Sequence, residues 1–224
     1  KKLIDKKQIA DLKIVAIVLT YSKKECIIRD YNKEIKFITE HPQRNNLIRN
    51  LCIDLKGNTL VLFSLIKHGQ LLHDLIKERA HVNRKTFFVF GGTDSETREK
   101  IREEFVNPKS GLDILIANPA ACSESISLHK TCHNAIYYDL SYNCAQYLQS
   151  LDRIHRVGGS EKQEAYYYYL QYEDTMEPDI LKNLKRKAKK MYQIIDGDFN
   201  IYSMDMFEDF DEIEAYEKLF INNE

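Results

Sequence analysis

The sequence Thr59-Leu60-Val61-Leu62-Phe63-Ser64 contains a short apolar run, Leu60 to Phe63, and a helical pattern follows it in Gly69 to Glu78. The run is too short for a helix, and its unbroken apolar character is typical of a parallel strand that is buried on both faces. Gly69 to Glu78 carries Leu71, Leu72 and Leu75 at helical spacing. A buried strand followed by such a helix is the repeating unit of an α/β fold.

The rest of the chain repeats this unit. Five more short apolar runs predict strands: Ile14 to Leu19, Phe87 to Phe90, Ile114 to Ala117, Ala135 to Tyr138 and Ala165 to Leu170. Helices are predicted between them, in Arg44 to Lys56, from a capping box at Thr93-Asp94-Ser95-Glu96 to about Phe105, and after Asn143 up to Gly158-Gly159. Strands and helices that alternate at this spacing predict right-handed crossovers and a mainly parallel sheet.

Composition excludes several classes of protein. The chain has 224 residues, a net charge of −1, 43% apolar residues and 30% charged residues, which suits one globular domain with an appendage. No apolar run approaches the roughly 20 residues that span a bilayer, and the start of the sequence lacks the apolar region of a secretory signal. We therefore expect a cytoplasmic protein with no membrane partner.

Five cysteines are spread widely and form no CxxC pair. Cys132, His133 and Cys144 are conceivable ligands, but buried, reduced thiols and no metal site are the expectation.

The end of the chain has two runs of charge. Basic residues dominate Lys182 to Lys190, inside a long polar helix predicted over Asp174 to Tyr192, and acidic residues dominate Asp205 to Glu217. Solvated helix faces are the ordinary interpretation of such runs.

The segment Gln149-Ser150-Leu151-Asp152-Arg153-Ile154-His155-Arg156-Val157-Gly158-Gly159 carries the strongest indication of chemistry. On a helix, Gln149, Arg153 and Arg156 fall within an arc of roughly 60°, opposite the apolar residues. Two guanidinium groups one turn apart can hold phosphate oxygens. By spacing alone, arginines that pair with acidic neighbours on a surface helix explain the pattern better.

The wider sequence changes that balance. Gln149-x-x-x-Arg153-x-His155-Arg156-x-Gly158 resembles motif VI of superfamily-two helicases, most closely the Swi/Snf-type branch. The segment Ile114 to Leu128 resembles motif V, and Thr59 to Ser64 resembles motif IV. The motifs occur in the family's order, from about Asn58 to Leu170. The first 57 residues are similar to the lobe-connecting region of phage-type recombination helicases.

The resemblance implies a RecA-like second lobe, with a three-layer α/β fold and a C-terminal helical extension. It divides the chain into a connecting segment with an edge strand and a helix (1–57), the lobe (58–172), and a brace-like helix with an acidic tail (173–224). Arg153 and Arg156 would be arginine fingers for ATP, and Gln149 would position water or the γ-phosphate.

The resemblance also implies binding residues. Glu124 and Ser125 would contact nucleotide. Four residues at strand ends would approach the phosphate backbone of DNA, expected to be double-stranded: Ser64, Gly91, Asn118 and Pro119. The sequence departs from the family at Ser123 and Ser125, where glycine is usual, and at Gly159, where glutamine is usual.

No GxxxxGK[ST] segment and no acidic magnesium-binding box occur in the sequence. ATP and Mg²⁺ would therefore need an N-terminal RecA-like lobe as a partner, and we expect this chain alone to be inactive as an ATPase.

Two alternatives remain. One is a non-catalytic module derived from that lobe, which would bind nucleic acid or protein through Lys182 to Lys190. The other is an unrelated doubly wound enzyme, which ranks low because Lys23-Lys24-Glu25, rather than a glycine-rich loop, follows the first strand.

Overall fold

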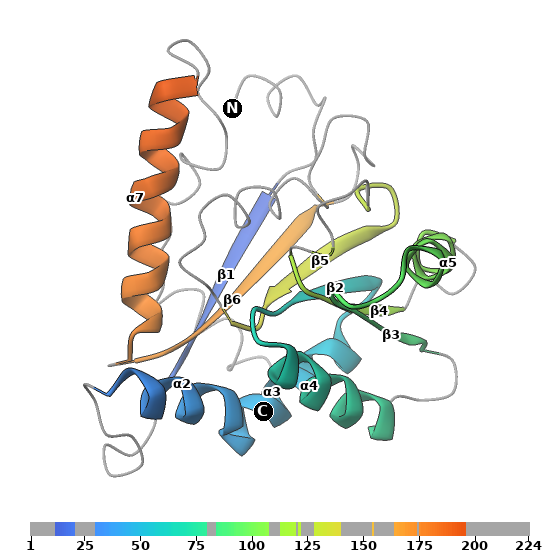
Figure 1. Ribbon diagram of the computed structural model, residues 1–224, viewed down its shortest axis with the longest axis horizontal. Helices are drawn as coiled ribbons and strands as arrows, with labels where there is room; N and C mark the ends of the chain where they lie inside the picture. Colours follow the sequence, from blue (N-terminus) through green and yellow to red (C-terminus); the bar gives the residue numbers. More distant parts are fainter. Residues whose placement is uncertain are drawn as a thin grey trace.

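A computed structural model describes residues 12–20, 30–79, 84–107, 113–119, 121, 128–139, 154, 164–173 and 175–195. Six strands form one parallel sheet in the order β1-β6-β5-β2-β4-β3 (Figure 1). The strands are β1 (Leu12–Leu19), β2 (Asn58–Leu62), β3 (Thr86–Val89), β4 (Ile114–Ala117), β5 (Cys132–Tyr137) and β6 (Ala165–Tyr172). Each strand contains most or all of a run predicted from the sequence, so the α/β fold with a parallel sheet is confirmed.

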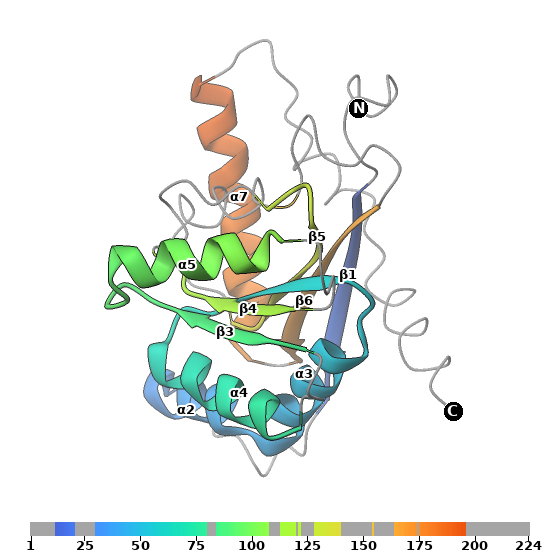
Figure 2. The ribbon, with the colours of Figure 1, turned by 90° about the vertical axis from the view of Figure 1, so that its right-hand side faces the viewer.

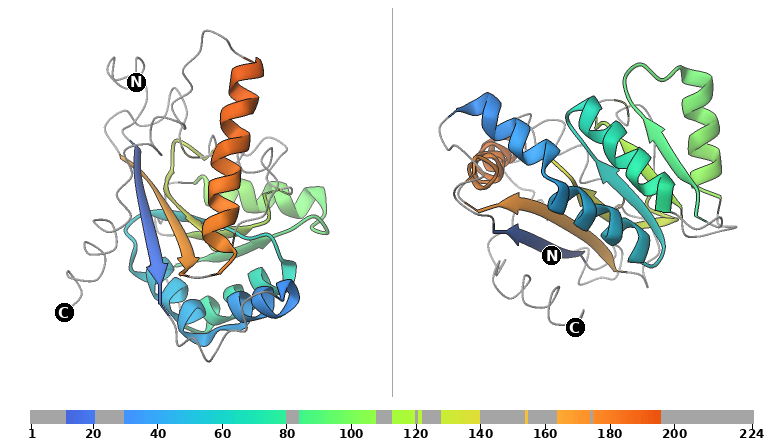
Figure 3. Two further views of the ribbon diagram at one scale, coloured as in Figure 1. Left: turned by 90° about the vertical axis from the view of Figure 1, so that its left-hand side faces the viewer. Right: turned by 90° about the horizontal axis from the view of Figure 1, so that it is seen from below.

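Helices cover both faces of this sheet. On one face lie α2 (Tyr31–Glu40), α3 (Pro42–Asp54) and α4 (Ile66–Arg79), and on the other lie α5 (Ser95–Phe105) and α7 (Glu177–Ile195) (Figures 2 and 3). None of the helices among the described residues is long and apolar enough to cross a membrane. The arrangement is the three-layer architecture expected of a RecA-like lobe.

Strand β2 shows why the apolar runs are continuous. Leu60 and Leu62 pack with the core beneath α5 and α7, whereas Val61 and Phe63 pack with the core beneath α3 and α4. Successive side chains of a strand point to opposite faces, so a strand covered on both sides needs apolar residues at every position.

The four consecutive tyrosines of β6 follow the same alternation. Tyr167 and Tyr169 belong to the core beneath α5 and α7, and Tyr168 belongs to the opposite core. The rings of Tyr169 and Tyr137 stack with their centroids 4.6 Å apart.

The predicted capping box at the start of α5 is wrong. The N-cap is Asp94, whose carboxylate accepts a hydrogen bond from the Thr97 amide at 2.8 Å. The Thr93 hydroxyl instead accepts from the Phe90 amide at 3.1 Å, inside the preceding turn. A carboxylate at an N-cap also interacts favourably with the helix dipole.

The predicted three-part division of the chain stays a prediction. Strand β1, from the first part, pairs with β6 along its whole length at the edge of the sheet. The first part also holds two helices, α2 and α3, where one was expected. Helix α7 begins the third part and packs on the sheet through Ile180, Leu181 and Leu184. The helix predicted after Asn143 lies outside the described residues except for Ile154, which is buried in the core beneath α5 and α7.

Candidate nucleic-acid interface

The structure brings together the four residues that were predicted to approach nucleic acid. Ser64 follows β2, Gly91 follows β3, and Asn118 and Pro119 follow β4. Strands β2, β4 and β3 are neighbours, and all three run parallel. Their carboxyl ends therefore lie at one edge of the sheet, with neighbouring strands about 4.8 Å apart. Ligands of open α/β sheets bind at this edge.

The loop from β2 to α4 consists of Phe63, Ser64 and Leu65, and hydrogen bonds hold it from two sides. The backbone amide of Ser64 donates to a carboxylate oxygen of Asp139, which follows β5. The side-chain amide of Asn118 donates to the carbonyl oxygens of Phe63 and Ser64, at 3.2 Å each. The loop is thus tied to the strands on both sides of β2.

Asp139 also contacts His68 in the first turn of α4. Its second carboxylate oxygen lies 2.7 Å from His68 Nδ1, and both side chains are buried. The His68 ring stacks on that of Tyr138, with the centroids 3.6 Å apart. Burial lowers the pKa of His68, although the Asp139 carboxylate opposes that shift. Neutral His68 then carries its hydrogen on Nδ1, and this N–H donates a hydrogen bond to the Asp139 carboxylate.

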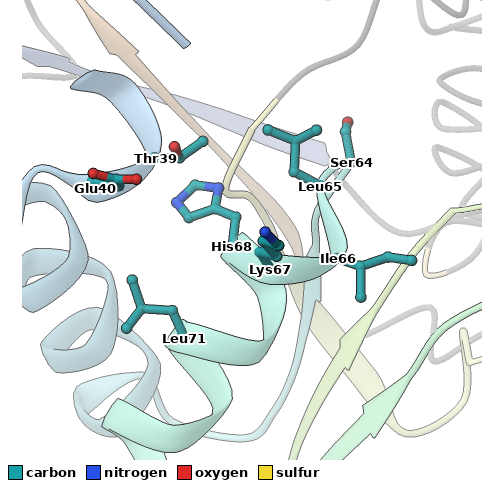
Figure 4. Close-up of a pocket in the computed structure, with 8 residues that line it drawn as sticks. All are labelled: Thr39, Glu40, Ser64, Leu65, Ile66, Lys67, His68 and Leu71. Atoms are coloured by element: carbon teal, nitrogen blue, oxygen red, sulfur yellow. The ribbon is translucent and has the colours of Figure 1, made fainter. Parts of the chain in front are cut away.

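A pocket of about 620 Å³ opens beside this loop, between the end of α2 and the start of α4. Figure 4 shows the His68 ring reaching toward Thr39 and Glu40, with the apolar side chains of Leu65 and Leu71 nearby. Nε2 of His68 is buried and has no hydrogen-bond partner among the described residues. Ser64 also lines the pocket, two residues before α4 begins at Ile66.

The turn after β3 presents an open backbone. The Phe90 amide donates to the Thr93 hydroxyl at 3.1 Å, and the Thr93 amide donates back to the Phe90 carbonyl at 3.0 Å. Gly91, at the tip of this turn, is exposed, and no atom would lie within 4 Å of a Cβ added there. By contrast, a Cβ on Gly92 would meet the Phe90 ring at 2.5 Å. The two glycines thus have different roles, and only Gly91 leaves space for a ligand.

A buried ion pair lies next to the carboxyl end of β5, at the same edge of the sheet. Arg44 of α3 is fully buried, and its guanidinium lies 2.5 and 2.6 Å from the two carboxylate oxygens of Glu177 at the start of α7. It also donates to the Tyr138 carbonyl, one residue before Asp139. Burial disfavours the charged guanidinium, but the Glu177 carboxylate more than offsets this and raises the pKa of Arg44. The pair ties α3 and α7 to the end of β5.

The predicted catalytic and nucleotide-binding residues lie outside the described part of the chain. These are Gln149, Arg153, Arg156, Glu124 and Ser125, together with Ser123 and Gly159. Their predicted roles stay predictions.

The loop after β2 does not fit a nucleotide phosphate cradle. The position after β2, where such a cradle would stand, holds Phe63-Ser64-Leu65 without a glycine, and the Ser64 amide is already bonded to Asp139. Within the described residues, no group of three or more His, Cys, Asp or Glu side chains could hold a metal ion. Cys132 is buried, and burial raises the pKa of its thiol to about 12, so the free thiol is protonated at neutral pH.

Sequence reasoning missed Asp139, His68, Arg44 and Glu177. Asp139 could have been found, because a polar residue directly after a buried strand faces the edge where ligands bind. The contacts of Arg44 with Glu177 gave no local signal, since the two residues come close only when α3 and α7 are placed on opposite sides of the sheet end.

Residues 43–158, just over half of the chain, match the helicase conserved C-terminal domain. The ATP-dependent DNA helicase UvsW of phage T4 is 31% identical over 166 residues, covering 71% of this chain and 32% of UvsW. The SWI/SNF chromatin-remodeling complex subunit snf22 of Schizosaccharomyces pombe is 28% identical over 129 residues, covering 58% of this chain and 7% of snf22.

Solved structures agree in fold. The crystal structure of T4 UvsW has a TM-score of 0.59 at 24% identity, covering 83% of this chain and 40% of that one. The C-terminal part of the Fun30 ATPase domain has a TM-score of 0.53 at 21% identity, covering 84% of this chain and 54% of that one. The chain spans about a third of the length of UvsW, and much less of snf22. The chain belongs to the helicase conserved C-terminal domain family, as a RecA-like second lobe of the superfamily-two type near the Swi/Snf and UvsW branches.

Proposed function

We propose that this chain is the C-terminal motor lobe of an ATP-dependent DNA helicase or double-strand DNA translocase. The observation that carries the proposal is the alignment of Ser64, Asn118, Pro119 and Gly91 at the ends of three adjacent parallel strands. The names of UvsW, an ATP-dependent DNA helicase, and of the chromatin-remodeling subunit snf22 support the same class of activity.

The proposed strand-tracking surface binds the phosphate backbone of DNA. Ser64 contributes its hydroxyl group, because its backbone amide is already bonded to Asp139. The exposed backbone at Gly91 allows a phosphate to come close without meeting a side chain. Contacts of this type carry no sequence preference and weaken as salt concentration rises.

ATP and Mg²⁺ are bound, in this proposal, by an N-terminal RecA-like lobe that acts as the partner of this chain. Arg153 and Arg156 are the arginine fingers, Gln149 positions water or the γ-phosphate, and Glu124 and Ser125 contact the nucleotide. Arginine fingers can raise the rate of phosphoryl transfer by about 10³ to 10⁵, but only on a nucleotide that is already held. This chain by itself is therefore proposed to lack ATPase activity.

The test is ATP turnover by the natural gene product containing this sequence together with a nucleotide-binding lobe, with and without duplex DNA. DNA-stimulated turnover that collapses in Arg156→Ala, while DNA binding persists, supports the motor assignment. Turnover that does not depend on Arg156 contradicts it. Salt-sensitive DNA binding that is lost when the lysines of residues 182–190 are neutralised, without any ATPase role, favours the non-catalytic binding module instead.

A further inference from the structure

Two side chains, one after β4 and one after β5, form hydrogen bonds to the Ser64 loop, which consists of Phe63, Ser64 and Leu65. Asp139 accepts from the Ser64 amide, and Asn118 donates to the carbonyl oxygens of Phe63 and Ser64. The amide that parallel-sheet loops commonly offer to a ligand is thus used internally. What remains for nucleic acid is the Ser64 hydroxyl, whose direction depends on the backbone that these two residues hold.

Both oxygens of Asp139 are engaged, one by the Ser64 amide and one by His68 Nδ1 at 2.7 Å. Hydrogen bonds to a charged acceptor are about twice as strong as neutral ones, so the carboxylate is the stronger of the two attachments. Asp139 itself is held in place, because the guanidinium of Arg44 bonds the carbonyl of the preceding residue, Tyr138. The Asp139 side chain is buried, and the hydrogen bond that it accepts from the Ser64 amide is partly buried.

We propose that Asp139 is a positioning residue for nucleic-acid binding, which acts by holding the Ser64 loop and never touches the nucleic acid itself. Asn118 acts in the same way from the other side, so its side chain serves the loop instead of a phosphate. The inference rests on the proposed function, because it explains how the strand-tracking surface keeps its shape. It adds Asp139, and it changes the expected role of Asn118 from contact with the phosphate backbone to an indirect effect that passes through Ser64.

The test compares four variants of the 224-residue chain: Asp139→Ala, Asp139→Asn, Ser64→Ala and the double variant Ser64→Ala/Asp139→Ala. The readouts are duplex DNA affinity at several salt concentrations, hydrogen exchange of the Ser64 amide, and the ¹⁵N resonances of the His68 ring. Asp139→Ala should speed exchange of the Ser64 amide and lower DNA affinity about tenfold, the size expected for loss of a charged hydrogen bond. The double variant should bind no more weakly than Asp139→Ala, because both changes act through one group.

Asp139→Asn provides the conservative rescue. The side-chain oxygen of asparagine can still accept from the Ser64 amide, so most DNA affinity should return. Its NH₂ group would then face His68, which should move its proton from Nδ1 to Nε2 so that Nδ1 can accept. A change in tautomer with DNA affinity preserved is a result that general loss of packing would not produce.

Asp113 is the matched control. It is also a buried aspartate whose carboxylate accepts from a backbone amide, that of Lys85 at 3.2 Å, but it stands at the opposite, amino end of β4. Asp113→Ala should lower stability while leaving the DNA affinity of the folded chain unchanged.

The outcomes separate the two proposals. DNA affinity that falls in Ser64→Ala but not in Asp139→Ala contradicts the positioning role and leaves the proposed function standing. Affinity that is unchanged in Ser64→Ala contradicts the proposed tracking surface, while exchange of the Ser64 amide still reports whether Asp139 holds the loop. If Asp139→Ala does not fold, Asp139→Asn decides alone: DNA affinity that stays unchanged although exchange of the Ser64 amide becomes faster overturns the inference.

Discussion

Arg44 of α3 and Glu177 of α7 are 133 residues apart in the sequence, yet they form a two-pronged ion pair in the interior, with N–O distances of 2.5 and 2.6 Å. Glu177 also accepts from the Tyr172 amide at 2.8 Å, and Arg44 lies over the Tyr172 ring. Helices from the start and the end of the described chain are thus joined directly beneath the carboxyl edge of the sheet.

Loss of one partner of this pair should be costly. Arg44→Met leaves the Glu177 carboxylate buried without its counter-charge, and we expect a loss of about 3–5 kcal/mol in the free energy of unfolding, measured by urea denaturation. Adding Glu177→Gln, which keeps an acceptor for the Tyr172 amide, should restore part of that loss. The exposed pair of Lys100 and Glu96 is the control, since Lys100→Met should change stability by less than about 0.5 kcal/mol. Equal losses in the free energy of unfolding for Arg44→Met and Lys100→Met would contradict the conclusion that burial makes the Arg44–Glu177 pair important.

The backbone at Gly91 should matter for nucleic acid and not for folding. Gly91→Ala places its methyl group in open space, so the free energy of unfolding should stay the same or rise by about 0.4–1 kcal/mol. Duplex DNA affinity, measured by fluorescence anisotropy, should fall because the methyl group keeps the phosphate backbone away. The control is Gly69→Ala, whose Cβ would lie 2.6 Å from the buried Phe63 ring and should lower stability by about 1–3 kcal/mol. Unchanged DNA affinity in Gly91→Ala would exclude close approach at this turn.

Arg84 should act as a cap for the carboxyl end of α3. Its guanidinium donates to the carbonyl oxygens of Cys52, of Ile53 at 2.9 Å and of Leu55 at 2.6 Å, where the helix has no further amides to offer. Arg84→Ala should lower the free energy of unfolding by about 1–3 kcal/mol. Arg49, in the same helix, bonds only the neighbouring Asn50 side chain among the contacts described, so Arg49→Ala should be nearly neutral. A Tm for Arg84→Ala that matches the unsubstituted chain would rule out the capping role.

Stability should fall as the solution becomes acidic, in part through His133 of β5. Burial lowers the pKa of His133 below its ordinary value of 6.5, and nearby His129 adds to the shift. Below about pH 6.5 the unfolded chain binds a proton that the folded chain does not, so the free energy of unfolding decreases with falling pH until the lower, folded-state pKa is passed. Urea denaturation of His133→Leu between pH 8 and pH 5 should show a shallower dependence. His68, whose pKa is lowered in the same direction, keeps part of the slope in that variant. An identical slope in both proteins would exclude His133 as a source.

The sequence by itself determined the sheet and the place of the candidate interface. Continuous apolar runs such as Ile114–Ala117 can be satisfied only by strands that are covered on both faces, and parallel strands bring their carboxyl ends to one edge. The resemblance to superfamily-two helicases singled out Ser64, Gly91 and Asn118 at strand ends, and the strand order of the structure then brought those ends together. Thr93 shows the limit of local patterns, because its hydroxyl was used by the preceding turn and Asp94 became the cap.

Only the tertiary structure decided how that edge is held. The contacts of Asp139 with the Ser64 amide and of Arg44 with Glu177 join residues that lie 75 and 133 positions apart. Nothing in the neighbouring sequence of any of these residues indicates its partner, since each pairing depends on the order of the strands and on which face each helix covers. Hydrophobic periodicity can be recognised within one short segment of the sequence. A buried hydrogen bond between distant segments forms only once the chain has packed.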